Sequence, residues 1–118
     1  MDLNCMYVLC DTVKHSWGME NTSEYCDYEV FRGQCEPQQA LKIIFAEYGH
    51  IGIGKCVKAD IGFFGCKTDV TQLLGSKCDY KKICEIDTLN QQLRERNTCT
   101  TGITVYLKVK FACIAGKI

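Results

Sequence analysis

The chain has 118 residues, and its 14 lysines and arginines balance its 14 aspartates and glutamates, so the formal net charge is zero. A chain of this length is expected to form one domain. No basic stripe points to nucleic acid, no polybasic patch points to anionic lipid, and no apolar run is long enough to span a membrane.

Ten cysteines are spread along the whole chain, at positions 5, 10, 26, 35, 56, 66, 78, 84, 99 and 113. Their number is even, and the tight C-x2-C pairs that are typical of zinc sites do not occur. This pattern indicates an extracellular disulfide framework. The acceptor triplet Asn21-Thr22-Ser23 agrees with a secreted or extracellular location. Because His15 and His50 are the only imidazoles, we expect no metal site and no cofactor.

Residues 1–25 show little periodicity and are expected to form an N-terminal extension. Cys5 and Cys10 are close enough in sequence to bridge each other. The alternatives are a bond from this arm to the body of the domain or to a second chain. The opening segment MDLNCMYVLC lacks the basic region of a signal peptide. We therefore expect a mature form, or an excised ectodomain or C-terminal module.

The first strand-like segments follow Cys26. The segment YEVFRGQC is short and β-prone, and LKIIFAE is apolar on both of its sides, with Phe45 on the same side as Ile43. A strand that is apolar on both sides is expected to lie in the centre of a sheet.

A glycine-rich region follows the second of these strands. Gly49 frees the backbone to turn sharply, so Tyr48 and His50 are expected to project from a rim. Residues 49–65 hold five of the ten glycines. This stretch is expected to be a long loop that Cys56 and Cys66 hold in place.

Two segments, TDVTQLLGSKC and DTLNQQLRER, are expected to form short helices. In the first segment, Asp69 is placed to cap the helix and Gly75 to end it. In the second segment, Thr88 and Gln91 have the spacing of a capping box.

The clearest strand is ITVYLKVKFAC, residues 103–113, in which apolar residues occupy the odd positions. The odd positions, Val105 among them, are expected to face the core. Strands on either side of two short helices predict a small α+β domain, with antiparallel strands, long loops and disulfide staples.

Four segments share their order and spacing with one known family. CDYEVFRGQC gives an opening pair of cysteines, FAEYGH stands where the family has A-N-Y-G-R or F-A-S-F-G, CDYKKIC matches C-x-G-K-x-x-C, and VYLKVKFAC matches a closing K-Y-L strand. Residues 26–113 therefore resemble the galactose- and rhamnose-binding lectin domain of sea-urchin egg lectin, which also occurs in fish egg lectins, latrophilin ectodomains and plant β-galactosidases. Residues 114–118 are then a C-terminal tail.

The resemblance also implies a disulfide pairing, which spacing alone leaves open among 105 possibilities for eight cysteines. The implied pairs are Cys26–Cys56, Cys35–Cys113, Cys66–Cys99 and Cys78–Cys84. Cys5 and Cys10 have no counterpart in the family, which favours a bond between them.

A lectin holds the hydroxyls of a sugar with carboxylate, amide or cationic groups, and meets its C–H face with an aromatic ring. The resemblance implies that the sugar-binding residues here are Asp27, Tyr48, Gly49, His50, Asn97 and Gly102. His50 replaces an arginine of the family motif, Asn97 replaces an aspartate, and Val105 stands in place of a lysine. These departures predict an altered or weakened sugar specificity.

The resemblance thus implies a secreted carbohydrate-binding domain that takes galactose- or rhamnose-like glycans. The alternative is an extracellular protein–protein interaction module that keeps the scaffold without its sugar site. No nucleophile–base motif and no paired carboxylates occur at a recognisable spacing, so we do not expect an enzyme. A single weak site would need oligomerisation to reach useful avidity.

Overall fold

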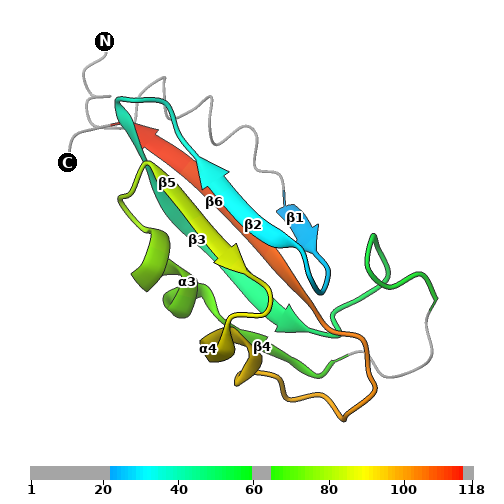
Figure 1. Ribbon diagram of the computed structural model, residues 1–118. Coiled ribbons are helices and arrows are strands. Elements are labelled where there is room, and N and C mark those ends of the chain that lie inside the picture. The colour runs from blue at the N-terminus through cyan, green and yellow to red at the C-terminus, as the bar shows by residue number, and fades with distance from the viewer. Residues whose placement is uncertain (1–21, 60–64, 116–118) are drawn as a thin grey trace.

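The structure is a computed structural model that describes residues 22–59 and 65–115. These residues form a small α+β fold of antiparallel strands and short helices, as the sequence predicts (Figure 1). The elements in chain order are β1 (Thr22–Tyr25), β2 (Val30–Gln34), β3 (Gln39–Gly49), β4 (Lys67–Asp69), α3 (Thr71–Cys78), β5 (Ile83–Asp87), α4 (Gln91–Arg94) and β6 (Tyr106–Ala115).

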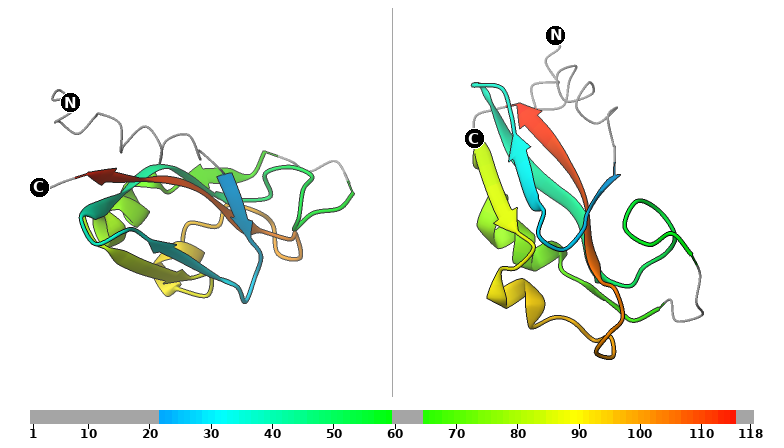
Figure 2. Two further views of the ribbon diagram at one scale, coloured as in Figure 1. Left: turned by 90° about the horizontal axis from the view of Figure 1, so that it is seen from above. Right: turned by 45° about the vertical axis from the view of Figure 1, so that its right-hand side comes forward.

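The strands form two antiparallel sheets that lie in separate layers (Figure 2). The larger sheet has the strand order β1-β6-β3-β4, and the smaller one consists of β2 and β5. The strand β3 has a neighbour on each side, which confirms that LKIIFAE belongs to a central strand. Its pairing with β6 runs from Gln39 opposite Ala115 to Gly49 opposite Tyr106, so these two long strands form the centre of the larger sheet.

The hydrophobic core fills the space between the layers. Phe31 from β2 and Ile86 from β5 pack into the same cluster as the inward side chains of β3 and β6. Val105, just before β6, and Leu107 and Val109 in β6 are buried in this cluster as the alternation predicts, and Phe111 and Cys113 are partly buried against it. Leu74 of α3 and Leu93 of α4 close the cluster from the helical side.

One prediction for β3 is wrong because the strand contains an irregularity. The pairing with β6 shifts register between Ile43 and Phe45, which is typical of a β-bulge. Beyond the shift, Ala46 and Tyr48 occupy the core positions that strict alternation from Ile43 would have given to the odd residues. Phe45 is only partly buried and lies outside the core cluster.

Both helices form, but their predicted ends need correction. The carboxylate of Asp69 accepts a 2.8 Å hydrogen bond from the N–H of Thr71, the first residue of α3. The N-cap position itself, however, is occupied by Val70 and not by Asp69. Gly75 does not end α3, which continues to Cys78.

The predicted capping box of α4 is also wrong. Asn90 is the N-cap of α4, and its side chain accepts a hydrogen bond from the Leu93 N–H. Thr88 is fully buried instead, and its hydroxyl donates to the Glu29 carbonyl at 2.8 Å. This hydrogen bond joins the end of β5 to the start of β2. The spacing of residues within the segment around Thr88 does not indicate such a contact.

The loop after β3 is held from two sides. The hydroxyl of Tyr106 accepts from the Gly52 N–H and donates to the Gly52 carbonyl, both at 3.0 Å. The carboxylate of Glu24 in β1 accepts from the backbone N–H groups of Lys55 and Cys56 at 2.9 and 3.3 Å. Residues 50–59 therefore lie fixed against β1 and β6 without regular secondary structure.

The predicted division of the chain places limits at Cys26 and Cys113. The strand β1 precedes the first limit and pairs with β6, and β6 itself ends two residues beyond the second limit, at Ala115. The N-terminal residues before β1 and the last three residues lie outside the described ranges, so the division into extension, domain and tail stays a prediction.

Candidate functional site

Disulfides hold the loops around the predicted sugar-binding residues. The described residues contain the disulfides Cys26–Cys56, Cys35–Cys113, Cys66–Cys99 and Cys78–Cys84, the same pairs that the resemblance implies. The first of these joins the turn after β1 to the loop after β3, and the third joins the start of β4 to the loop before β6. The predicted pair Cys5–Cys10 lies outside the described residues.

Asp27 lies in the turn between β1 and β2, where its carboxylate accepts a 2.8 Å hydrogen bond from the guanidinium of Arg94 in α4. About a third of each side chain is exposed, 37% for Asp27 and 38% for Arg94. The pair is therefore partly open to solvent. It presents both a hydrogen-bond acceptor and a set of donors to a ligand at the surface.

Tyr48 lies beneath this pair. Its side chain is fully buried, and within the described residues its hydroxyl forms no hydrogen bond of good geometry. Burial raises the pKa of Tyr48, and the charge of Asp27 adds to this effect. The guanidinium of Arg94 lies close enough to lower the pKa of Tyr48, both by its charge and by hydrogen bonding. Both charged groups are thus close enough to act on the hydroxyl, so the structure brings Asp27, Tyr48 and Arg94 together.

Gly49 is required by its backbone conformation and by its surroundings. Its φ is +150°, and a β-carbon there would meet the carbonyl oxygen of Cys66 and lie 2.6 Å from the α-carbon of Lys67. No other residue fits this close approach of β3 and β4. Gly49 thus shapes the site through its backbone.

His50 is not on a rim, so the prediction that Tyr48 and His50 both project outward is wrong. Only 1% of His50 is exposed, and its Nδ1 lies 2.7 Å from the Thr104 carbonyl oxygen. Its backbone N–H also donates to the Cys66 carbonyl at 3.1 Å. The imidazole therefore packs between the end of β3 and the loop that leads into β6.

The remaining predicted residues, Asn97 and Gly102, lie in the exposed loop before β6. The side chain of Asn97 accepts a 2.7 Å hydrogen bond from the Cys99 N–H, so it holds a turn. Gly102 has a φ of +96° and open space around it. Within the described residues, no hydrogen bond or ion pair joins this loop to Asp27. The loop is connected to the end of β3 through the Cys66–Cys99 disulfide, because the Cys66 carbonyl accepts from the His50 N–H.

Comparison with known proteins identifies the family. Residues 33–113 match the D-galactoside/L-rhamnose binding SUEL lectin domain. The chain belongs to this family. A comparison of the chain with curated proteins finds no significant match. SUEL lectin domains form a carbohydrate-binding family rather than an enzyme family, and a disulfide-rich lectin domain is typical of extracellular proteins.

Arg94 is the residue of this cluster that the sequence did not predict. It follows the buried Leu93 in α4, and nothing in its local sequence distinguishes it from Arg96 two residues later. Only the fold shows that its side chain reaches Asp27, 67 positions earlier in the chain. The lectin domain thus has a guanidinium close to Tyr48, although His50 replaces the arginine of the family motif.

Tyr28 completes the surface beside the pair. Its φ is +76°, which is unfavourable for a residue with a side chain, and it is 80% exposed. Neither a favourable backbone conformation nor burial therefore accounts for a tyrosine at this position. Tyr28 directly follows Asp27 in the turn between β1 and β2, so its exposed ring lies next to the residue that pairs with Arg94. The lectin domain therefore offers an exposed aromatic ring next to a carboxylate and a guanidinium.

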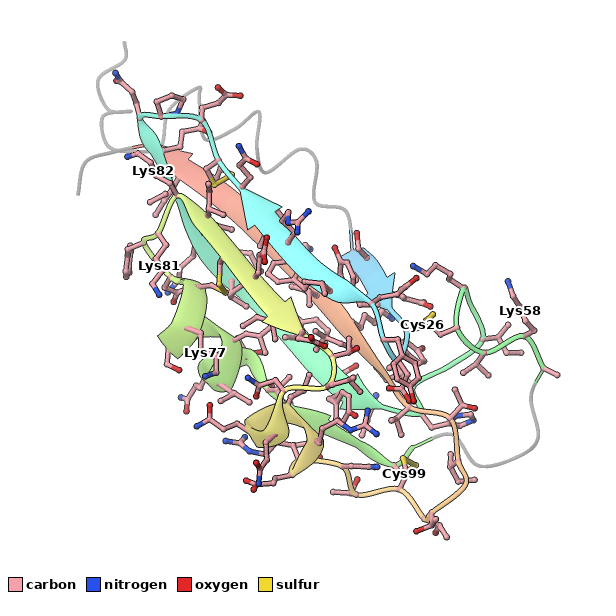
Figure 3. The ribbon with its side chains drawn as sticks, in the orientation of Figure 1. Cys26, Lys58, Lys77, Lys81, Lys82 and Cys99 are labelled. Carbon is pink, nitrogen blue, oxygen red and sulfur yellow. A yellow bond between two sulfur atoms is a disulfide. The ribbon has the colours of Figure 1, made fainter. Side chains whose placement is uncertain are left out.

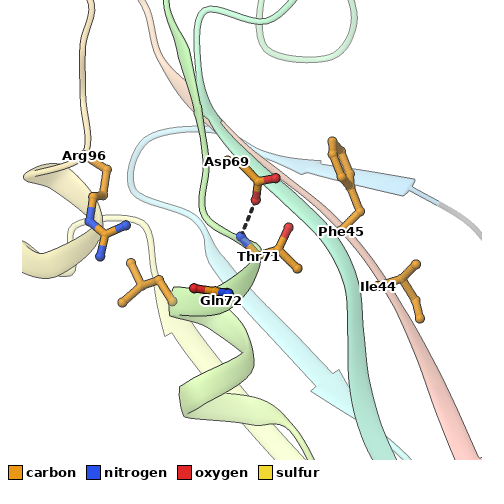
Figure 4. A pocket seen from close by; sticks show the side chains of 7 residues that line it. Ile44, Phe45, Asp69, Thr71, Gln72 and Arg96 are labelled. Carbon is orange, nitrogen blue, oxygen red and sulfur yellow. Dashed lines mark hydrogen bonds between the residues drawn. The ribbon is translucent and has the colours of Figure 1, made fainter.

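One hollow in the described part of the lectin domain lies away from these residues. It is an open depression of about 530 Å³ between the bulge of β3, the start of α3 and the end of α4 (Figure 4). Its lining residues are Ile44, Phe45, Asp69, Thr71, Gln72, Leu73 and Arg96. None of the residues implied by the resemblance lines it, so we base the sugar site on chemistry rather than on the depth of a hollow.

Two further findings concern the part of the chain that the structure describes. No three or more histidine, cysteine, aspartate or glutamate side chains there are grouped so that they could hold a metal ion. None of its helices has the length and apolar character needed to cross a bilayer.

Proposed function

We propose that this lectin domain binds the terminal sugar of a galactose- or rhamnose-type glycan at the surface formed by Asp27, Tyr28 and Arg94, above the buried Tyr48. The observation that carries the proposal is the 2.8 Å contact between the partly exposed Asp27 and Arg94. Adjacent sugar hydroxyls need acceptors and donors a few ångströms apart, and this pair supplies both.

The aromatic ring of Tyr28 supports the same surface. A sugar presents an apolar C–H face, and an exposed phenol next to charged groups is suited to stack against it. These groups differ in part from the family motif, which supports a specificity altered from that of other members.

The test is binding of galactose and rhamnose, measured by titration calorimetry, together with a glycan array on the full chain. Arg94→Ala should weaken sugar binding about tenfold, which corresponds to the loss of one or two hydrogen bonds to a ligand. Arg32→Ala is the matched control. Arg32 forms the same kind of pair with Glu85, at 2.6 Å, on the exposed face of β2 and β5.

Equal effects of Arg94→Ala and Arg32→Ala would contradict the proposed site.

A second candidate is an extracellular protein–protein interaction module. It is favoured by the burial of His50 and the turn held by Asn97, because both leave fewer polar groups free for a sugar. A flat glycan array combined with saturable binding to a protein would support this candidate.

A further inference from the structure

A second surface lies at the other end of β3, on the turn between α3 and β5. The turn is closed by the Cys78–Cys84 disulfide. Its backbone is also bonded to the start of β3, because Tyr80 donates to the Leu41 carbonyl at 2.7 Å and Lys81 accepts from the Leu41 N–H at 2.8 Å. The turn is therefore a rigid platform. It is well separated along β3 from Tyr48 (Figure 1).

Tyr80 has an unfavourable backbone conformation on this platform. Its φ is +71°, a region that suits glycine, and the family motif C-x-G-K-x-x-C has a glycine at this position. A side chain there costs about 1–2 kcal/mol. Burial does not offset the cost, since Tyr80 is 60% exposed, and the stabilising interaction that its ring makes is a cation–π contact with the Lys42 ammonium, 5.4 Å from the ring centroid. An exposed and strained aromatic residue of this kind points to a role in binding.

Positive charge gathers around Tyr80. Lys77, Lys81 and Lys82 lie on the same side of the domain (Figure 3). Within the described residues, none of their ammonium groups has a carboxylate within 4 Å, in contrast to Lys42, which pairs with Asp79 at 3.0 Å. The chain as a whole is neutral, so this end carries a local excess of positive charge.

A hollow adjoins the charged turn. It has a volume of about 480 Å³ and is lined by Gln34, Cys35, Glu36, Pro37, Lys82 and Ile83. Its walls combine a cation, a carboxylate, an amide and apolar surface, which suits a polar ring with an apolar face. A flat anionic bilayer would make no use of such a hollow, and we therefore favour a sugar chain as the ligand.

We propose that Tyr80, the three lysines 77, 81 and 82, and the adjoining hollow bind an acidic glycan, one that carries sulfate or carboxylate groups. The lysines meet the anionic groups, the phenol stacks on the C–H face of one sugar unit, and the hollow receives its neighbour. This site is separate from the proposed galactose or rhamnose site, so the domain can bind an acidic glycan whether or not it binds galactose or rhamnose.

The test is titration of the full chain with a heparin-derived hexasaccharide and with the same hexasaccharide after chemical desulfation. We expect binding to the sulfated form that weakens with rising salt, and little binding to the desulfated form. Replacing all three lysines by alanine should weaken binding by at least about tenfold. Excess free galactose or rhamnose should leave this binding unchanged.

Tyr80→Gly is the decisive variant because it removes the ring and also relieves the backbone strain. It should weaken hexasaccharide binding about threefold to tenfold while the melting temperature stays equal or rises. Lys58→Ala is the matched control, since Lys58 is also exposed and unpaired among the described residues but lies on the loop after β3 (Figure 3).

Three results would overturn the proposal. They are no binding of the sulfated hexasaccharide, an equal loss of binding in Lys58→Ala and in the triple lysine variant, and full binding by Tyr80→Gly. Phosphatidylserine vesicles and a short DNA duplex serve as other polyanions. If either binds as tightly as the hexasaccharide, the surface recognises negative charge in general and the glycan assignment is wrong.

Discussion

The Nδ1 of His50 lies 2.7 Å from the carbonyl oxygen of Thr104, and this contact joins the end of β3 to the loop that enters β6. The imidazole is buried, and it occupies the position where the family motif has an arginine. In this chain the residue therefore has a structural role at the edge of the proposed sugar site.

We predict that His50→Ala lowers the free energy of unfolding by about 1–3 kcal/mol, because it removes the hydrogen bond to the Thr104 carbonyl and opens a cavity at a buried position. His50→Arg should destabilise the domain as well, since it forces a larger, charged side chain into a buried position. Urea denaturation of both variants, with Lys58→Ala as an exposed control, measures these effects. An unchanged midpoint for His50→Ala would show that the contact is dispensable.

Gly49 and Gly52 allow a matched comparison of two glycines in one region. Gly49→Ala should cost about 1–3 kcal/mol or more, because its φ is +150° and a β-carbon would run into the Cys66 carbonyl. Gly52→Ala should change stability by less than about 0.5 kcal/mol, because a β-carbon there has nothing within 4 Å. Thermal unfolding measures both, and similar effects for the two variants would contradict the packing of β3 on β4.

The disulfides should contribute to stability according to the length of chain that each one closes. Cys35–Cys113 spans 78 positions and Cys78–Cys84 spans 6. The chain-entropy relation gives contributions of about 4.5 and about 2.2 kcal/mol for these two bonds. Replacing both cysteines of a pair by alanine should therefore cost about 2 kcal/mol more for the longer span. Guanidinium denaturation of the two double variants checks the order, and the reverse order would show that unfolded-state entropy is not the dominant contribution.

Asp69 should make stability depend on pH in the acid range. Hydrogen bonds from Thr71 hold the pKa of the Asp69 carboxyl below its usual value. A carboxyl whose pKa is lower in the folded state stabilises the fold at neutral pH, and this contribution disappears as the pH falls through about 4 toward the folded-state pKa.

Asp69→Asn keeps an oxygen that can accept the Thr71 N–H bond but removes the titration. The variant should lose less stability than the parent protein between pH 7 and pH 3, measured by urea denaturation at each pH. If both proteins lose the same amount, the acid dependence arises from other carboxyls such as Glu29, whose pKa is lowered by its contact with Lys55.

The sequence predicts the long strands of this fold well, because their signal is local. Alternation in β6 and continuous apolarity in β3 each follow from the environment of neighbouring residues in one strand. The register shift at Ile43 and Phe45 could not be predicted, because a bulge is set by the partner strand. The predicted start of α4 was wrong for a similar reason. Thr88 has the spacing of a cap, but its hydroxyl donates to the backbone carbonyl of Glu29, 59 positions earlier.

The candidate sites divide in the same way. The resemblance points to Asp27 and Tyr48, and the fold brings these two together. Arg94 could not be recognised, since its role depends on a contact across most of the chain. The cluster around Tyr80 was missed because Lys77 lies at the end of a helix and Lys81 and Lys82 follow a turn, so their common side appears only in three dimensions.

The hydroxyl of Tyr106 binds both the N–H and the carbonyl of Gly52, and neither bond involves a side chain of the loop. A tyrosine at this place in β6 can therefore hold loops of quite different sequence along the same path. Related domains that keep this tyrosine are free to diversify the side chains of the loop without rebuilding its course. The loop is thus a natural position for grafting new recognition residues onto the scaffold.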